Sequence, residues 1–348
     1  MNASQRIDVH QHIVPPVWAK ALNDLGLDSG GWAIPAWSAA DAIAMMDEQG
    51  IATGVLSVTA PGVHLSNNAP GKGTTTGTTT GTGTATGTGT GRSTDNQRAP
   101  QAQTLARAVN EYGAEMAKDH PTRIGSFASV PLPDVDAALE EAAYALDTLG
   151  ADGVVLMSNT GGRYLGDPAF EPLWAELDRR AAVVFVHPAQ PPMPLLPGTP
   201  APVADYVFDT TRTALNMALN GVLSRHRKVK VILSHGGGFL PYAAYRFAGL
   251  NATALDTSRT AEDVIHDLKR FYFDTALAAS PSSLPSLLAF AEPGHVLYGS
   301  DWPFAPQEAG TYYNRFLETY PDFAPGQAEA IDRGNAEALF PRLAQPKA

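Results

Sequence analysis

Residues 6–12 read Arg-Ile-Asp-Val-His-Gln-His, an apolar, β-branched run that ends in two histidines. Alternate residues of a β-strand point the same way, so a strand here directs the imidazoles of His10 and His12 to one point. Imidazole is the nitrogen ligand that zinc and similar metals bind most often in proteins. A lone His-x-His pair is a weak motif, and its weight depends on the residues at the ends of the other strands.

Short apolar runs alternate with longer amphipathic segments along the rest of the chain, which is typical of a parallel sheet built from strand–helix units. Several runs are nearly pure Val, Ile, Leu and Phe, as expected for strands buried on both faces. Eight strands with helices between them predict a closed (β/α)8 TIM barrel in one domain, residues 1–348, because the rival open doubly wound sheet usually has fewer strands. The expected strands are Arg6–His10, Gly54–Val58, Gly125–Val130, Gly153–Met157, Val183–His187, Lys230–Ser234, Phe271–Asp274 and His295–Gly299.

Helices are expected in the gaps between these strands. Ser38 and Asp41 have the spacing of a helix N-terminal cap, and Gly50 ends that segment after Gln49. The other expected helices are Gln101–Asp119, Val135–Leu149, Pro168–Ala181 and Val203–Arg225.

One segment departs from the pattern. Residues 66–96 are expected to form a low-complexity insert in the loop after the second strand, since Gly71–Gly91 is almost entirely Gly and Thr. Such a segment has no apolar face whose burial would offset the entropy of ordering it. It is interpreted as a spacer or as a mobile lid, because that loop opens on the face of a barrel where catalysis takes place.

Composition excludes several classes of function. The chain has 35 acidic and 24 basic residues, a formal charge of −11, which disfavours binding to nucleic acid. It has no cysteine, and this rules out thiol nucleophiles, thiolate metal sites and disulfides. Neither a signal peptide nor a membrane-spanning run is recognisable. A cytoplasmic protein without a nucleic-acid or membrane partner is therefore expected.

Three further strands end in residues that bind metals or transfer protons. His187 ends the fifth strand, His235 follows the sixth and Asp301 follows the eighth. The carboxyl ends of barrel strands form the rim where barrel enzymes carry out chemistry, so these residues are expected beside His10 and His12. The remaining histidines are not expected in the metal site, and these are His64, His120, His226, His266 and His295. Of these, His64 could reach substrate.

The fourth strand indicates how many metal ions the site holds. A two-metal site of this kind needs a bridging carboxylate or carboxylated lysine, usually from that strand. Here the strand and the residues after it read Gly-Val-Val-Leu-Met-Ser-Asn, with neither Lys nor Glu. One metal ion is predicted, and three imidazoles with one carboxylate leave a position for water or substrate.

These motifs resemble those of the amidohydrolase superfamily and, more narrowly, of the 2-amino-3-carboxymuconate-6-semialdehyde decarboxylase family with its salicylate-type decarboxylases. The resemblance runs from Arg6 to about Leu343, apart from the insert. It rests on Ile-Asp-Val-His-Gln-His at 7–12, Phe-Val-His-Pro at 185–188, Ser-His-Gly-Gly-Gly at 234–238 and Gly-Ser-Asp-Trp-Pro-Phe at 299–304.

The resemblance implies roles for particular residues. The divalent metal, zinc or else manganese, would be held by His10, His12, His187 and Asp301, with His235 and Asp301 transferring protons. Arg246 would bind the substrate's carboxylate across the interface of a homodimer or higher homo-oligomer, although a solvated helix charge is the alternative. Trp302 and Phe304 are the expected substrate contacts from the last motif.

The expected substrate is a small carboxylic acid. The family prototype has a second carboxylate-binding arginine after the first strand, whereas this chain has no arginine between Arg6 and Arg92 and offers Trp18, Trp32 and Trp37 instead. Aromatic rings suit a flat apolar ring better than a second carboxylate. We therefore expect decarboxylation, without an organic cofactor, of an ortho-hydroxybenzoate such as a 6-methylsalicylate-like acid, or of a related unsaturated acid. Hydrolysis of a lactone or amide on the same barrel is the alternative.

Overall fold

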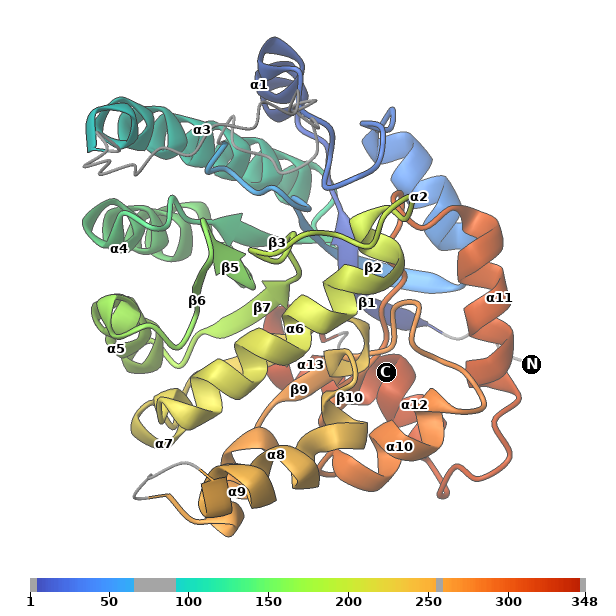
Figure 1. Ribbon diagram of the computed structural model, residues 1–348. Coiled ribbons are helices and arrows are strands. Elements are labelled where there is room, and N and C mark those ends of the chain that lie inside the picture. Colours follow the sequence, from blue (N-terminus) through green and yellow to red (C-terminus); the bar gives the residue numbers. More distant parts are fainter. Residues whose placement is uncertain (1–4, 66–91, 255–258, 345–348) are drawn as a thin grey trace.

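The computed structural model describes residues 5–65, 92–254 and 259–344. Eight parallel strands form one sheet in the order β1-β2-β3-β4-β7-β8-β9-β10, with helices around it (Figure 1). The first and last strands meet, because the N–H of Val9 donates to the carbonyl of Tyr298 at 3.0 Å and the N–H of Asp301 donates to that of His10 at 2.7 Å. The predicted (β/α)8 barrel is confirmed. Its strands are β1 Arg6–His12, β2 Ile51–Ser57, β3 Ile124–Ser129, β4 Gly153–Met157, β7 Val183–His187, β8 Lys230–Leu233, β9 Tyr272–Asp274 and β10 Val296–Leu297.

Thirteen α-helices are found in the described parts of the chain, and a short hairpin of β5 Asn159–Thr160 and β6 Arg163–Tyr164 follows β4. None of these helices is long and apolar enough to cross a membrane. The helices are α1 Pro16–Leu25, α2 Ala39–Glu48, α3 Arg92–Asp119, α4 Val135–Tyr144, α5 Glu171–Arg179, α6 Ala201–Leu219, α7 Val222–Arg225, α8 Leu240–Ala254, α9 Ala261–Leu268, α10 Ser283–Phe290, α11 Gln307–Glu318, α12 Gln327–Glu329 and α13 Asn335–Leu339.

Two sequence expectations concern the boundaries of helices. The Ser38 hydroxyl accepts the N–H of Asp41 at 3.1 Å and begins α2, as predicted. Helix α3 begins at Arg92 instead of Gln101, so the last five residues of the expected insert, 92–96, are helical. The rest of that insert lies outside the described residues.

The interior of the barrel is an apolar column that ends below the carboxyl rim. Its members come from all eight strands and pack together, which requires that they point to a common centre. The stacked rings of Phe127 and Phe185 form its middle, with centroids 5.4 Å apart, and Phe340 closes the amino end after α13. This rigid column fixes the strand ends from which the polar residues project.

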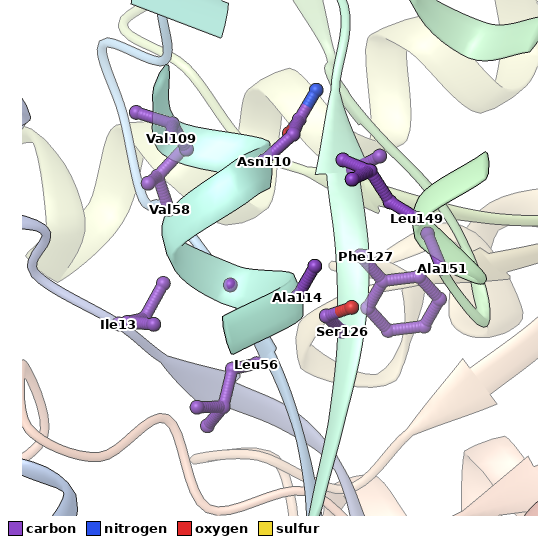
Figure 2. A pocket seen from close by; sticks show the side chains of 12 residues that line it. Ile13, Leu56, Val58, Val109, Asn110, Ala114, Ser126, Phe127, Leu149 and Ala151 are labelled. Carbon is purple, nitrogen blue, oxygen red and sulfur yellow. The ribbon is translucent and has the colours of Figure 1, made fainter. Parts of the chain in front are cut away.

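A small cavity lies between α3 and the sheet (Figure 2). Ala114 on α3 lies opposite Ser126 on β3, and most of the lining is apolar. Its volume of about 10 Å³ is at the lower limit for one water molecule. None of the predicted site residues lines it, so it is a packing defect and not a substrate site.

Candidate metal centre

The strand ends bring together the side chains that the sequence predicted to meet. Asp301 Oδ1 lies 3.0 Å from His12 Nε2 and 3.2 Å from His10 Nε2, and these two nitrogens are 3.2 Å apart. The ring centroids of His12 and His187 are 4.9 Å apart. All four residues are buried, with at most 8 % of any of them exposed to solvent. The carboxyl rim of the barrel thus holds a compact group of nitrogen and oxygen donors.

His235 belongs to the same group. One potential ligand atom from each of His10, His187, His235 and Asp301 lies within 4.8 Å of the other three. His12 is joined to this set through its contacts with His10 and Asp301. The geometry therefore offers five donors around one point, one more than a tetrahedral shell takes.

The four histidines are oriented in the same manner. Each uses Nδ1 in a hydrogen bond with an oxygen that accepts, so Nδ1 carries the proton and the lone pair of Nε2 faces the group. The acceptors are Asp274 Oδ2 for His10 at 2.7 Å, the Ser57 carbonyl for His12 at 3.1 Å, the Pro188 carbonyl for His187 at 2.8 Å and the Ala276 carbonyl for His235 at 3.0 Å. Such support of the ring by a second hydrogen bond is typical of histidines that bind metals.

The backbone is strained at two members of the group. His235 has φ 54° and Asp301 has φ 63°, in the left-handed region that L-residues rarely adopt. Three glycines follow His235, and a Cβ at Gly238 would lie 2.1 Å from the carbonyl oxygen of Val207 on α6. Only glycine permits that approach, which holds the turn after His235 against the helix.

The charges of the group favour a cation. Burial lowers the pKa of His10, but the carboxylates of Asp274 and Asp301 outweigh it and raise that pKa to about 10. Burial raises the pKa of Asp301, but His10 and His12 together hold it well below its usual value. Burial, together with His12 and His10, holds the pKa of His187 well below its usual value. Anionic carboxylate and imidazole donors, without sulfur, suit zinc or manganese, and a divalent ion can balance the charge that a proton on His10 balances otherwise.

Two buried carboxylates behind the group have roles that the sequence analysis did not assign. Asp274 ends β9 and supports His10. Asp8 Oδ1 accepts the N–H groups of His10 and Ser300, both at 3.0 Å, and its Oδ2 accepts the Ser300 hydroxyl at 2.5 Å, which ties β1 to the segment after β10. Burial raises the pKa of Asp8 to about 7. Asp274 ends a predicted strand as His187 does, so a signal for it was present in the sequence.

Aromatic rings and one hydroxyl surround the group. The ring of Phe304 lies 5.3 Å from that of His12, and the ring of Tyr206 lies 6.2 Å from that of His187. Thr59 Oγ1, two residues beyond β2, is 3.3 Å from His187 Nε2. Sequence reasoning missed Thr59 and Tyr206, since neither belongs to a recognisable motif.

The other expected substrate contacts lie outside the group. Arg246 is exposed on α8. Trp302 is partly buried, packs against the main apolar cluster, and its carbonyl accepts the N–H of His12 at 2.7 Å. Trp18 is fully buried and donates to the carbonyl of Gly62 at 2.8 Å, so it packs the loop, while Trp32 is 40 % exposed.

Comparisons with known proteins agree with this geometry. The sequence profile of the family described as amidohydrolase matches residues 7–342. Decarboxylase macB of Penicillium terrestre is 40 % identical and covers 97 % of this chain and 95 % of its own. The 6-methylsalicylic acid decarboxylase of Penicillium expansum is 38 % identical and covers 97 % of each chain.

A crystal structure of an amidohydrolase II superposes with a TM-score of 0.81 at 29 % identity, over 97 % of this chain and 99 % of its own. The fold, the motifs at the strand ends and the family profile thus coincide over nearly the whole barrel, and the chain belongs to the amidohydrolase family.

Proposed function

We propose that this protein is a metal-dependent decarboxylase of a small aromatic acid with a hydroxyl group ortho to the carboxylate, such as 6-methylsalicylate. One observation carries the proposal: a buried group of four imidazoles and one carboxylate, with the Nε2 atoms directed inward, lies beside aromatic rings. The names of the similar fungal proteins point to the same reaction.

One divalent ion, zinc or else manganese, would be held by His10, His12, His187 and Asp301. When bound, such an ion supplies a template and a Lewis acid for the substrate's carboxylate and neighbouring hydroxyl. Strand β4 ends without a Lys or Glu, and Ser158, the first residue after it, donates its hydroxyl to Asp209, so this strand offers no bridging ligand to the group. This supports one metal ion and not two.

Asp301 and His235 would transfer the protons of the reaction. The proton must reach the ring carbon that carries the carboxylate; the bond to the carboxylate then breaks, its electron pair returns to the ring, and carbon dioxide leaves. The low pKa of Asp301 keeps its carboxylate ionised, so Asp301 must take up a proton before it can deliver one to the ring. His235 donates from Nδ1 to Ala276, so its Nε2 is the atom that can hold a water and pass a proton.

Aromatic contacts would orient the substrate ring. Phe304 lies beside His12 and packs against the same apolar cluster as Trp18, and Tyr206 lies beside His187. Aromatic side chains such as Phe304 and Tyr206 suit the flat, largely apolar ring of a benzoic acid with one carboxylate.

A second copy of the chain would complete the site. Helix α8 exposes two tyrosines, Tyr242 at 85 % and Tyr245 at 67 %, and also Leu250 at 48 %. Large apolar side chains on one helix face are typical of a surface that another protein covers. Arg246 lies among them, and in a homodimer or higher homo-oligomer it would reach the neighbour's substrate carboxylate.

The experiment is product analysis with the purified protein. Salicylate, 6-methylsalicylate, a dihydroxybenzoate, a lactone and an amide are supplied before and after removal of metal by a chelator, and zinc or manganese is then returned. The proposal predicts release of carbon dioxide from an ortho-hydroxybenzoate, lost on chelation and restored by metal. Hydrolysis of the lactone or amide without any carbon dioxide release would replace decarboxylation with the hydrolytic alternative.

A further inference from the structure

Asp209 is a fully buried carboxylate on α6 that the proposed reaction does not use. Its Oδ2 accepts hydrogen bonds from the Ser158 hydroxyl and from Asn159 Nδ2, the latter at 2.7 Å. Its Oδ1 accepts the hydroxyl of Tyr164 at 2.7 Å. All three donors lie in the segment after β4, so Asp209 ties that segment to the long helix.

Ser158 in turn holds both sides of the turn that follows His187. Its backbone N–H donates to the His187 carbonyl at 2.8 Å, and its Oγ accepts the N–H of Ala189, also at 2.8 Å. Between these two contacts lies Pro188, whose carbonyl accepts the His187 Nδ1 proton. The direction of the imidazole therefore depends on a turn that Ser158 fixes.

A serine hydroxyl has one hydrogen. To present a lone pair to Ala189, Ser158 must direct that hydrogen elsewhere, and Asp209 is the acceptor in its path. Hydrogen bonds to an ionised carboxylate in a buried site are stronger than neutral ones, and they fix the rotamer of the donor. We infer that Asp209, acting through Ser158, is a positioning residue that orients His187 Nε2 toward the metal. This role rests on the proposed function.

The chain offers variants that separate this role from general stability. Ser158→Ala removes the hydroxyl that connects Asp209 to the N–H of Ala189, and it is the smallest change among these variants. Asp209→Ala deletes the carboxylate, while Asp209→Asn can keep an oxygen toward Ser158 and Asn159 and turn its NH2 to the Tyr164 hydroxyl, which can accept. Tyr164→Phe is the matched control, because it removes a hydrogen bond from the same carboxylate on the side remote from His187.

The measurement is the zinc dissociation constant of each metal-free full-length protein, by competition with a chromophoric chelator. Far-UV circular dichroism and melting temperature report folding. We expect Ser158→Ala and Asp209→Ala to weaken zinc binding about 10-fold or more, the usual scale for partners of a metal ligand. Asp209→Asn should recover most of that loss, and Tyr164→Phe should stay within about twofold of the wild-type protein.

The outcomes distinguish the two proposals. A folded Ser158→Ala protein that binds zinc as tightly as the wild type overturns the positioning role and leaves the metal site intact. A wild-type protein that binds no stoichiometric zinc or manganese overturns the metal site and the positioning role with it. If Asp209→Ala does not fold, Ser158→Ala and Asp209→Asn decide. A Tyr164→Phe protein whose zinc binding is weakened as much as that of Ser158→Ala counts against the inference.

Discussion

Asp274 Oδ2 lies 2.7 Å from His10 Nδ1, and both residues are fully buried. The other oxygen of this carboxylate accepts the backbone N–H of His235 at 2.8 Å and that of Ala276 at 3.0 Å. One side chain thus sets the tautomer of His10 and fixes the start of the turn at His235. Two members of the candidate metal centre depend on the same carboxylate.

Asp274→Asn should therefore impair metal binding without removing any proposed ligand. Two backbone N–H groups face Oδ1, so the amide nitrogen must occupy the other position and donate to His10 Nδ1. That places the ring's proton on Nε2, the atom that faces the metal. We expect zinc affinity to fall about 10- to 100-fold by chelator competition. Asp267→Asn, a buried carboxylate on α9, is the control and should alter stability alone; equal affinities in both variants would refute the argument.

Removal of a proposed metal ligand should reduce metal binding more than Asp274→Asn does. His10→Ala and Asp301→Ala each remove a proposed ligand, so metal and decarboxylase activity should be lost together. Elemental analysis of the purified variants measures this directly. His226→Ala serves as the control, since His226 pairs with Glu171 at 2.9 Å outside the group and should keep its full metal content. Full metal occupancy in both His10→Ala and Asp301→Ala would show that neither residue is a metal ligand.

The α8 surface should control assembly. Tyr245→Asp places a charge on the exposed apolar face and should shift the protein toward monomers in sedimentation at assay concentration, with activity falling in parallel. Tyr312→Asp provides a matched control, because Tyr312 is 52 % exposed on α11, away from that face. A monomeric wild-type protein with full activity would exclude a role of Arg246 in a neighbour's site.

Two glycine substitutions should have opposite effects on stability. Gly113 lies within α3 beside the small cavity, and a Cβ there would lie 3.7 Å from the Ser126 Cβ, an ordinary contact. Gly113→Ala should raise the free energy of unfolding by about 1 kcal/mol. Gly26 ends α1 with φ 63° and has open space around it, so Gly26→Ala should lower stability by about 1 kcal/mol through backbone strain alone. Chemical denaturation measures the free energy of unfolding of both variants and so tests the predicted rise and the predicted fall.

The sequence indicated the strands well because a barrel strand is buried on both faces and reads as a continuous apolar run. β4 and β7 have the bounds expected from such runs. Helix α3 was predicted to start nine residues late, because the polar residues from Arg92 onward lack the apolar periodicity by which a helix is recognised. The extension includes Ser, Thr, Asp and Asn, which are weak helix formers, and a proline at 100, so helix propensity does not predict it either.

The candidate site was predictable only in part. A histidine or aspartate that ends or follows an apolar run can be recognised in the sequence, and this predicts His187 and Asp301 at the carboxyl rim of the barrel. The partners that orient those side chains are distant in sequence. Asp274 supports His10 across 264 residues, and Asp209 reaches Ser158 across 51. Such pairs need the register of the strands, which the apolar pattern alone does not define.

His12 and His235 both present an Nε2 atom to the group, and only one of them is needed to complete a tetrahedral shell with His10, His187 and Asp301. The set of donors whose ligand atoms all lie within 4.8 Å of one another contains His235, whereas the family resemblance places the metal on His12 and leaves His235 to transfer protons. Both rings direct Nε2 to the group, so orientation does not separate them. A tetrahedral shell of His10, His12, His187 and Asp301 is already complete, and catalysis needs a further position for water or substrate.

His235→Asn compared with His187→Asn resolves this division. His187 is a proposed ligand, so His187→Asn should lose metal and activity together. If His235 faces the substrate instead, His235→Asn should keep metal near wild-type occupancy, while the turnover number falls roughly 10²-fold or more, the scale of a lost acid–base group. Metal content and turnover are measured on the same preparations. Parallel loss of metal in both variants makes His235 a ligand and moves proton transfer to Asp301. Unchanged turnover in His235→Asn, with metal retained, means that the proton reaches the ring without this histidine.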